Sequence, residues 1–233
     1  MGLTFMRNSG WIKHFPELES LIDCPQNPEW HPEGDVWNHT LMVIDNAASL
    51  KHNVPEELRM AYMLGALLHD IGKPATTVLP ECTAHGHAEH GAKLAIDFMT
   101  RITGDKDLIS NVEALVKLHM HPGQLFRSEA KESSWKRLHN KLRLDVLAWL
   151  HKADSAGRTG RSIDDVNQVS ERCLEYFTNF GESKIAPIVQ GRHLVEMGMS
   201  PGRHFRSILD QAYELQIEGI NDVGEILEAL KLK

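Results

Sequence analysis

The sequence predicts an all-α fold. Strand signals are poor along its 233 residues, with few alternating Val, Ile and Thr runs and no Asn-Gly turn between them. Apolar residues recur instead at three- and four-residue steps, and Gly and Pro end these runs at recognisable points. Hydrophobic residues make up 42% of the chain and charged residues 24%, which allows one large helical domain with a sizeable core.

Helices are predicted wherever this periodicity persists, with ends uncertain by about 2–4 residues. The segment 72–87 is predicted to be a loop because it contains Gly72, Pro74, Pro80 and Gly86, and its length indicates a function beyond connection. The predicted helices span residues 10–22, 36–51, 56–71, 88–102, 106–119, 133–156, 163–179, 190–197, 202–218 and 221–231.

The chain is predicted to divide near Gly157–Arg161. Most of its 14 histidines precede this point, and the helices after it are shorter and more polar. We therefore expect a main domain at residues 1–160 and a small C-terminal helical extension at residues 161–233, packed on or next to it. Because histidine is the commonest metal ligand, its clustering in the first part of the chain is a first functional hint.

Composition excludes several classes of protein. The formal net charge of −7 argues against a protein that coats nucleic acid non-specifically, because phosphate neutralisation requires a basic surface. No run approaches about 18 consecutive apolar residues, so no membrane span is expected, and residues 1–10 lack a secretory signal. Cys24, Cys82 and Cys173 are scattered and odd in number, which favours unpaired thiols and a cytoplasmic location.

The predicted helix 56–71 ends in His69 and Asp70 after an almost wholly apolar run, and Gly72 follows as a plausible C-terminal cap. A carboxylate at the C-terminal end of a buried helix opposes the helix dipole, so it costs free energy unless a cation compensates it. A divalent metal ion at Asp70 would do so.

Two further residues lie on inward faces of other helices. His39 is in register with Val43 and Ala47 in helix 36–51, and Asp154 follows Leu144, Leu147 and His151 along an apolar stripe. Alone, His39 would more often be a hydrogen-bonded core histidine. Together, His39, His69, Asp70 and Asp154 offer two imidazoles and two carboxylates, which suits a divalent ion such as Mn, Mg, Ni, Co, Fe or Zn.

His87 and His119 extend this predicted site. His87 opens a helix in register with Gly91, Ala95 and Phe98, and His119 closes one in register with Val112 and Leu115. They could hold a second metal ion, since paired ions are common in phosphoester chemistry, or contact a substrate phosphate. They could equally be polar residues at the rim of the pocket.

Three cations near these residues are candidates for substrate binding. Lys73 comes one turn after His69 and Asp70, where it could stabilise charge on a phosphoryl oxygen. Arg158 and Arg161 follow Asp154 and could grip a phosphate with their planar guanidinium groups. The alternative is that all three are solvated loop charges.

The pattern His39, His69-Asp70 and Asp154 resembles the HD superfamily of metal-dependent phosphohydrolases. Over about residues 10–228 the chain is more closely similar to the HD domain and C-terminal tail of bacterial CCA-adding tRNA nucleotidyltransferases. The motifs of this resemblance are residues 16–18, 26–40, 69–73, 86–87 with Gly91, 153–154 with 157–160, 191–194 and 199–202.

The resemblance implies an HD-domain helical bundle, and it implies hydrolysis of nucleotides or of phosphates at RNA 3′ ends. The implied activities are 2′,3′-cyclic phosphodiesterase, 2′-nucleotidase and phosphatase, with at most weak contact between the tail helices and tRNA. The paired aspartates of a nucleotidyltransferase head are missing: the only Asp-x-Asp, at Asp105 and Asp107, is at a predicted helix start, where acidic residues favour the dipole. We therefore expect a stand-alone HD protein that does not add nucleotides.

The expected mechanism is metal-assisted hydrolysis, with Asp70, Lys73, His87 and His119 as the catalytic residues. Three alternatives use the same sequence differently. A di-iron HD oxygenase would need His87 and His119 at a complete second metal position. A hydrolase of a signalling nucleotide such as a guanosine polyphosphate would usually have regulatory parts that are not seen here. An RNA-binding accessory module with a vestigial HD site would not need the complete ligand set. The oligomeric state is not predicted.

Overall fold

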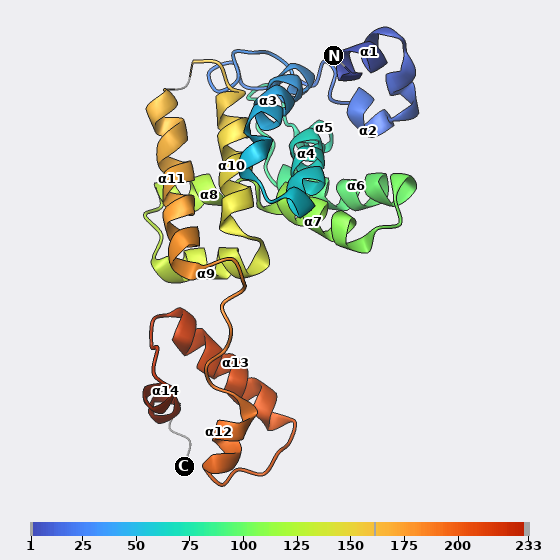
Figure 1. Cartoon of the computed structure of the whole chain (residues 1–233). Helices are drawn as coiled ribbons and strands as arrows, with labels where there is room; N and C mark the ends of the chain where they lie inside the picture. Colours follow the sequence, from blue (N-terminus) through green and yellow to red (C-terminus); the bar gives the residue numbers. More distant parts are fainter. Residues whose placement is uncertain (1, 161, 231–233) are drawn as a thin grey trace.

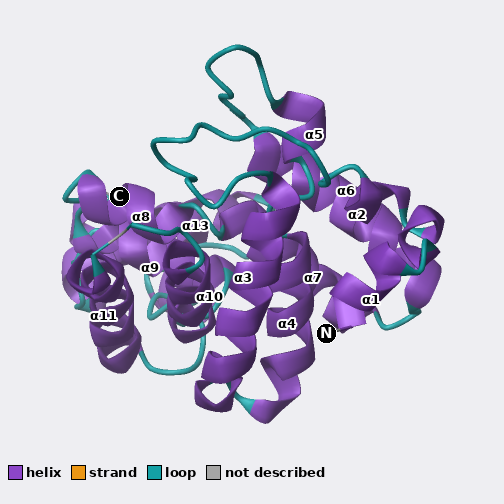
Figure 2. Ribbon diagram, turned by 90° about the horizontal axis from the view of Figure 1, so that it is seen from above, coloured by secondary structure: helices purple, strands orange, loops and turns teal. Residues whose placement is uncertain are grey.

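The computed structural model describes residues 2–160 and 162–230, and this part of the chain contains helices and loops but no β-strand. Figure 2 shows these helices and loops. The one strand-like pairing in the described residues is an isolated bridge between Val78 and Thr83. The predicted all-α fold is therefore confirmed. No helix in the described ranges is both long enough and apolar enough to cross a membrane.

The α-helices are α1 (Gly2–Asn8), α2 (Pro16–Glu19), α3 (Val36–Leu50), α4 (Arg59–Leu68), α5 (Lys73–Thr76), α6 (His87–Ile102), α7 (Lys106–Leu118), α8 (His121–Arg127), α9 (Glu132–Lys141), α10 (Leu144–Ala156), α11 (Ile163–Phe180), α12 (Gly191–Glu196), α13 (His204–Ile217) and α14 (Val223–Ala229). Three 3-10 turns accompany them, η1 (Trp11–His14), η2 (Lys51–Asn53) and η3 (Glu56–Leu58).

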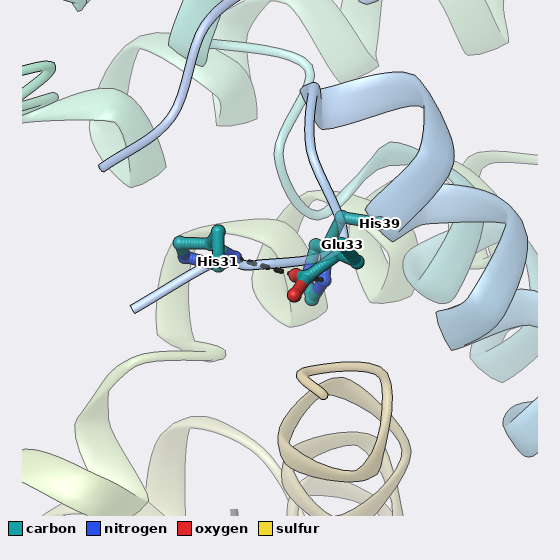
Figure 3. A group of neighbouring side chains, drawn as sticks. All are labelled: His31, Glu33 and His39. Atoms are coloured by element: carbon teal, nitrogen blue, oxygen red, sulfur yellow. Dashed lines mark hydrogen bonds and ion pairs between the residues drawn. The ribbon is translucent and has the colours of Figure 1, made fainter. Parts of the chain in front are cut away.

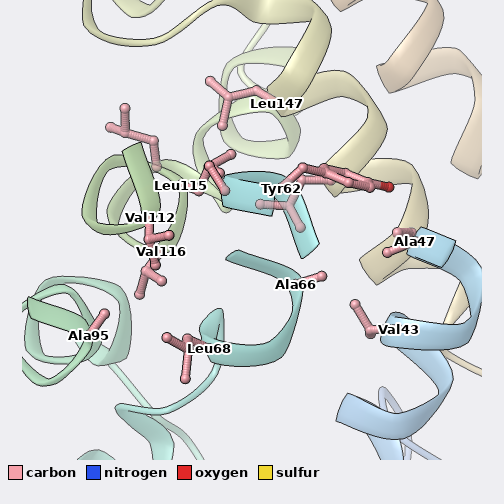
Figure 4. Packing of buried hydrophobic residues seen from close by; sticks show 14 of the residues in the cluster. Val43, Ala47, Tyr62, Ala66, Leu68, Ala95, Val112, Leu115, Val116 and Leu147 are labelled. Carbon is pink, nitrogen blue, oxygen red and sulfur yellow. The ribbon is translucent and has the colours of Figure 1, made fainter. Parts of the chain in front are cut away.

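The main core forms where α3, α4, α7 and α10 meet (Figures 1 and 4). Helix α4 is central, because it packs against the other three. Gly65 permits this approach, since a Cβ atom there would lie 2.9 Å from the Cβ of Leu115 on α7. The buried side chains around it include Val43, Ala47, Tyr62, Ala66, Leu68, Val112, Leu115, Val116 and Leu147.

Several predicted helices are divided in the structure. The predicted helix 10–22 is instead η1 and α2, because Pro16 starts a new helix at its first turn. The predicted helix 133–156 is broken by extended backbone at Leu142 into α9 and α10. Helices α1, α5 and α8 were not predicted; they have seven residues or fewer, too few for a clear periodicity.

The C-terminal part has a separate small core. Helix α11 packs along α10 and contributes the buried Cys173 to the main core, whereas Val189, Ala212 and Ile226 form a second cluster with α13 and α14. Figure 1 shows α12, α13 and α14 together, joined to α11 by an extended segment. The division at residue 160 stays a prediction, but the change from one core to the other comes after α11.

Candidate metal centre

Three helices bring His39, His69, Asp70 and Asp154 together. His39 lies one turn into α3, and Asp35 caps the start of this helix, because its side chain accepts a hydrogen bond from the Asn38 amide at 2.8 Å. His69 and Asp70 form the turn that ends α4, and Asp154 lies in the last turn of α10. All four side chains are buried, with exposed fractions of 3% or less.

The four side chains face one another at hydrogen-bond or ligand distances. The Nε2 atom of His39 is 3.0 Å from Oδ1 of Asp154, and Nε2 of His69 is 3.1 Å from Oδ2 of Asp70. The cross distances, from His39 to Asp70 and from His69 to Asp154, are 3.8 and 3.9 Å. The sequence therefore predicted correctly that these residues would lie together; that they bind a metal ion stays a prediction.

A second group shares Asp70. Its other oxygen, Oδ1, is 3.4 Å from Nε2 of His87 and 3.9 Å from Nε2 of His119. The two histidine Nε2 atoms are 3.3 Å apart. His87 begins α6 and His119 follows α7, so five separate elements contribute to a continuous cluster with one carboxylate at its centre.

The donor set fits a divalent metal ion. Backbone carbonyls of Ala66, Ala84 and Val116 lie 2.7–2.9 Å from Nδ1 of the three histidines that follow them, His69, His87 and His119. Donation from Nδ1 leaves the lone pair of Nε2 facing the cluster, as in metal-binding histidines. The Nε2 atom of His69 is buried and makes no hydrogen bond, although Oδ2 of Asp70 lies 3.1 Å away. A lone pair of nitrogen that faces a carboxylate oxygen is costly unless a cation lies between them.

A carboxylate that the sequence did not single out orients His39. Oε1 of Glu33 lies 2.8 Å from Nδ1 of His39 and 2.8 Å from Nδ1 of His31 (Figure 3). Burial would raise the pKa of Glu33, but the contacts with His39 and His31 lower it to about 2. Such a carboxylate behind a histidine fixes the ring and raises its basicity toward a metal.

Burial and neighbouring charges favour the ligand forms of Asp70, Asp154 and His119. Burial alone would raise the pKa of Asp70, but neighbouring His69 and Lys73 hold it well below its usual value. The pKa of Asp154 is lowered in the same way, with Arg158 as the largest opposing influence. Burial lowers the pKa of His119 to about 3, so its ring is neutral near pH 7.

Lys73 and Arg158 are not solvated loop charges. Lys73 is 8% exposed, and its Nζ atom lies 2.7 Å from Oδ2 of Asp70 and 2.7 Å from Oε1 of Gln26. Arg158 donates from Nη2 to both oxygens of Asp154, at 3.1 and 3.2 Å. Arg161, the third predicted cation, lies outside the described residues.

Two glycines set the distances between the helices of this cluster. A side chain at Gly72 would run into the carbonyl oxygen of His87, so glycine allows α6 to begin beside His69 and Asp70. A Cβ atom at Gly157 would lie 2.7 Å from a methyl group of Val43. The absence of a side chain at Gly157 therefore allows the end of α10 to pack against α3. The geometry of the cluster thus depends on how closely the backbones of these helices approach one another, as well as on its polar side chains.

Two cavities open onto the cluster. One of about 320 Å³ is lined by Asp70, Lys73, His87 and Arg158. The other, of about 240 Å³, is lined by His119, Asp154 and Arg158. A small molecule in either cavity would therefore contact the buried donors and at least one cation.

Comparison with known proteins relates the chain to one family and to curated relatives. Residues 36–155 match the HD domain family. The Multifunctional CCA protein of Acinetobacter baumannii is 34% identical over 165 residues, which are 66% of this chain and 38% of that protein. The chain thus spans less than two fifths of that relative's length.

Proposed function

Because the chain belongs to the HD domain family, we propose that it hydrolyses phosphoester bonds of nucleotides or RNA ends with the help of a divalent metal ion. The family is one of metal-dependent phosphohydrolases, and its relation to CCA-adding enzymes, predicted from the sequence motifs, is confirmed. One observation supports the proposal most: buried histidine and aspartate donors converge on Asp70 beside the buried Lys73 and the partly buried Arg158.

His39, His69, Asp70 and Asp154 would hold the metal ion, and Asp70, His87 and His119 could hold a second one. Bound there, a divalent ion would lower the pKa of a coordinated water and polarise a phosphoryl oxygen. The mixed nitrogen and oxygen donors suit Mn, Mg, Ni, Co, Fe or Zn.

The chain's own side chains would do the rest. Lys73 and Arg158 would bind the phosphoryl oxygens and stabilise the charge that grows on them in the transition state. Attack of water on phosphorus would break the phosphoester bond, and the proton that the water loses would pass by way of Asp70 to the leaving oxygen, while the neutral His119 would accept a hydrogen bond from that water. His87, 3.3 Å from His119, would orient the same water.

The proposed substrates rest on the resemblance of the sequence motifs to the HD domain of CCA-adding enzymes, because the cluster alone does not specify them. We propose 2′,3′-cyclic phosphodiesters, 2′-nucleotides and related phosphomonoesters, with weak tRNA contact through α12–α14 as a further proposal. An enzyme that acts on other substrates could contain the same cluster, since one fold and its metal site recur across different chemistries.

A di-iron oxygenase is the second candidate, and one observation favours it. His87 and His119 lie together with Asp70, and these three side chains could hold a second metal ion. An oxygenase would consume oxygen and would need iron, whereas a hydrolase would not. The full donor set also argues against a vestigial site in an RNA-binding module.

The proposal is tested by assaying metal-depleted protein that has been reloaded separately with Mg, Mn, Fe, Co, Ni or Zn. The substrates are 2′,3′-cyclic AMP, 2′-AMP, 3′-AMP and glycerol 2-phosphate, and bound metal is measured by elemental analysis. Turnover by the parent, absent in Asp70→Ala but retained in the surface control Asp97→Ala, is the expected result. Bound metal without turnover of any substrate would refute hydrolysis, and oxygen consumption with iron would favour the oxygenase.

A further inference from the structure

Trp30 lies at the junction of three cavities around the candidate centre. It lines the cavities of about 320 Å³ and 240 Å³ already described, and a third of about 580 Å³ that is also lined by Arg127 and Thr159. Its side chain is 61% exposed. A single exposed aromatic residue is ordinary on a protein surface, so its position is the informative feature.

The loop before α3 holds Trp30 close to the buried donors. The amides of Trp30 and His31 donate to the carbonyl of Asn27, at 3.1 and 2.8 Å. Glu33 then joins this loop to His39, and the Thr159 amide donates to Oε2 of Glu33 at 3.3 Å. The indole is therefore attached through a short, hydrogen-bonded segment to a candidate metal ligand.

The cations around Trp30 indicate the chemistry of what it contacts. Lys73 and Arg158 line the first cavity, and Arg127 lines the other two, in a protein of formal charge −7. The exposed acids Glu29 and Glu81 also line these cavities. Lys73 and Arg158 are the cations that contact the buried donors, through Asp70 and Asp154. An anionic group would lie there, with an aromatic surface beside it.

We propose that Trp30 stacks on the nucleobase of the substrate and so selects nucleotides over phosphoesters that lack a base. This inference rests on the proposed hydrolase function and specifies its substrate class. Base stacking on an aromatic side chain tolerates any base and contributes substantially to binding. A sugar phosphate without a base would leave the indole uncovered and would be held by its phosphate alone.

The test compares Trp30→Ala and Trp30→Phe with Trp11→Ala. Trp11 is a matched control, because it is 63% exposed and lies in η1, outside the cavities around the candidate centre. KM and kcat are measured for 2′-AMP and for glycerol 2-phosphate, and circular dichroism verifies the fold of each variant. In Trp30→Ala, KM for 2′-AMP should rise about ten-fold more than KM for glycerol 2-phosphate. Trp30→Phe should regain most of that loss, and Trp11→Ala should match the parent.

A binding measurement that needs no turnover accompanies the kinetics. Titration with 2′-AMP should quench the tryptophan fluorescence of the parent and of Trp11→Phe saturably, and this quench should be lost in Trp30→Phe. Equal effects of Trp30→Ala on both substrates, or a quench that persists in Trp30→Phe, would overturn the inference. If the parent hydrolyses no substrate, the hydrolase proposal fails, and the fluorescence alone then decides whether Trp30 binds a base.

Discussion

The main body and the C-terminal part of this chain differ most in what they bury. The core formed by α3, α4, α7 and α10 encloses a cluster of titratable side chains, and the Nε2 atom of His69 within it makes no hydrogen bond. The C-terminal cluster around Val189 and Ile226 buries one polar side chain, Gln216, among its described residues. Gln216 is satisfied, because it accepts from the Ile188 amide and donates to the Ala186 carbonyl, each at 3.0 Å.

This difference separates structural polar groups from functional ones. Burying an amide is inexpensive when both ends are hydrogen-bonded, so Gln216 needs no further explanation. Burying two carboxylates among four histidines is costly and is tolerated only where a large apolar core surrounds them. Buried polar groups that lack a hydrogen-bond partner within the protein are therefore the ones to test for function.

Asp70→Ala should have the largest effect on the main body. It removes the carboxylate shared by both groups of donors, so activity should fall by about a thousand-fold, the upper range for one preorganised electrostatic group. Bound metal, measured by elemental analysis, should fall with it. Retention of full metal content and activity would show that Asp70 is not part of the site, and Asp97→Ala on the outer face of α6 controls for loss of one negative charge.

Leu115→Ala should show how strongly the main core stabilises the protein. Leu115 is 1% exposed and fills the space beside Gly65, so its truncation should lower the free energy of unfolding by about 3 kcal/mol in denaturant titrations. Ile226→Ala in the second cluster should instead accelerate hydrogen exchange in α13 and α14 only. Faster exchange in α4 after Ile226→Ala would mean that the two cores unfold as one unit.

Glu33→Gln should weaken metal binding without disturbing the fold. The change keeps the shape of the side chain but removes the negative charge beside Nδ1 of His39, so metal affinity should fall about ten- to one-hundred-fold. Competition with a chelator measures the dissociation constant. Glu29→Gln, an exposed position in the same loop, should leave the affinity unchanged, and equal losses in both variants would contradict a specific role for Glu33.

Arg137→Ala should have the smallest effect on stability, because it removes only exposed ion pairs between the main body and the C-terminal part. Arg137 donates to Glu214 at 2.8 Å and to Glu218 at 2.6 Å, and all three side chains are exposed. Such exposed pairs contribute little to stability and are screened by salt. Thermal unfolding of parent and variant should therefore coincide at high ionic strength, and a difference that persists there would indicate more than an ion pair.

The residues of the cluster were predictable where local periodicity decided their direction. His39 and Asp154 lie on apolar helix faces, so their inward direction follows from three- and four-residue steps. Glu33 was not predictable, because its burial depends on α3 and on the distant Thr159 amide, which no local pattern encodes. The role of His87 was left open for the same reason, since its distance from Asp70 depends on how closely α6 approaches Gly72.

The fold shows the same division between local and distant causes. Long amphipathic helices such as α6, α7 and α11 were predicted close to their observed limits. The break between α9 and α10 was missed, because Leu142 continues the apolar spacing although its backbone is extended. Tertiary packing of Leu142, 8% exposed, outweighs the local preference for helix there.

The contact between His39 and Asp154 joins residues that are 115 positions apart in the chain. Closing so long a loop costs chain entropy that only the intervening core can offset. Contacts within α6 and α7, by contrast, are close in sequence and can form early. The cluster is therefore an indicator of complete folding of residues 33–158: partial unfolding at α3 or α10 would disassemble it even while α4, α6 and α7 stay packed.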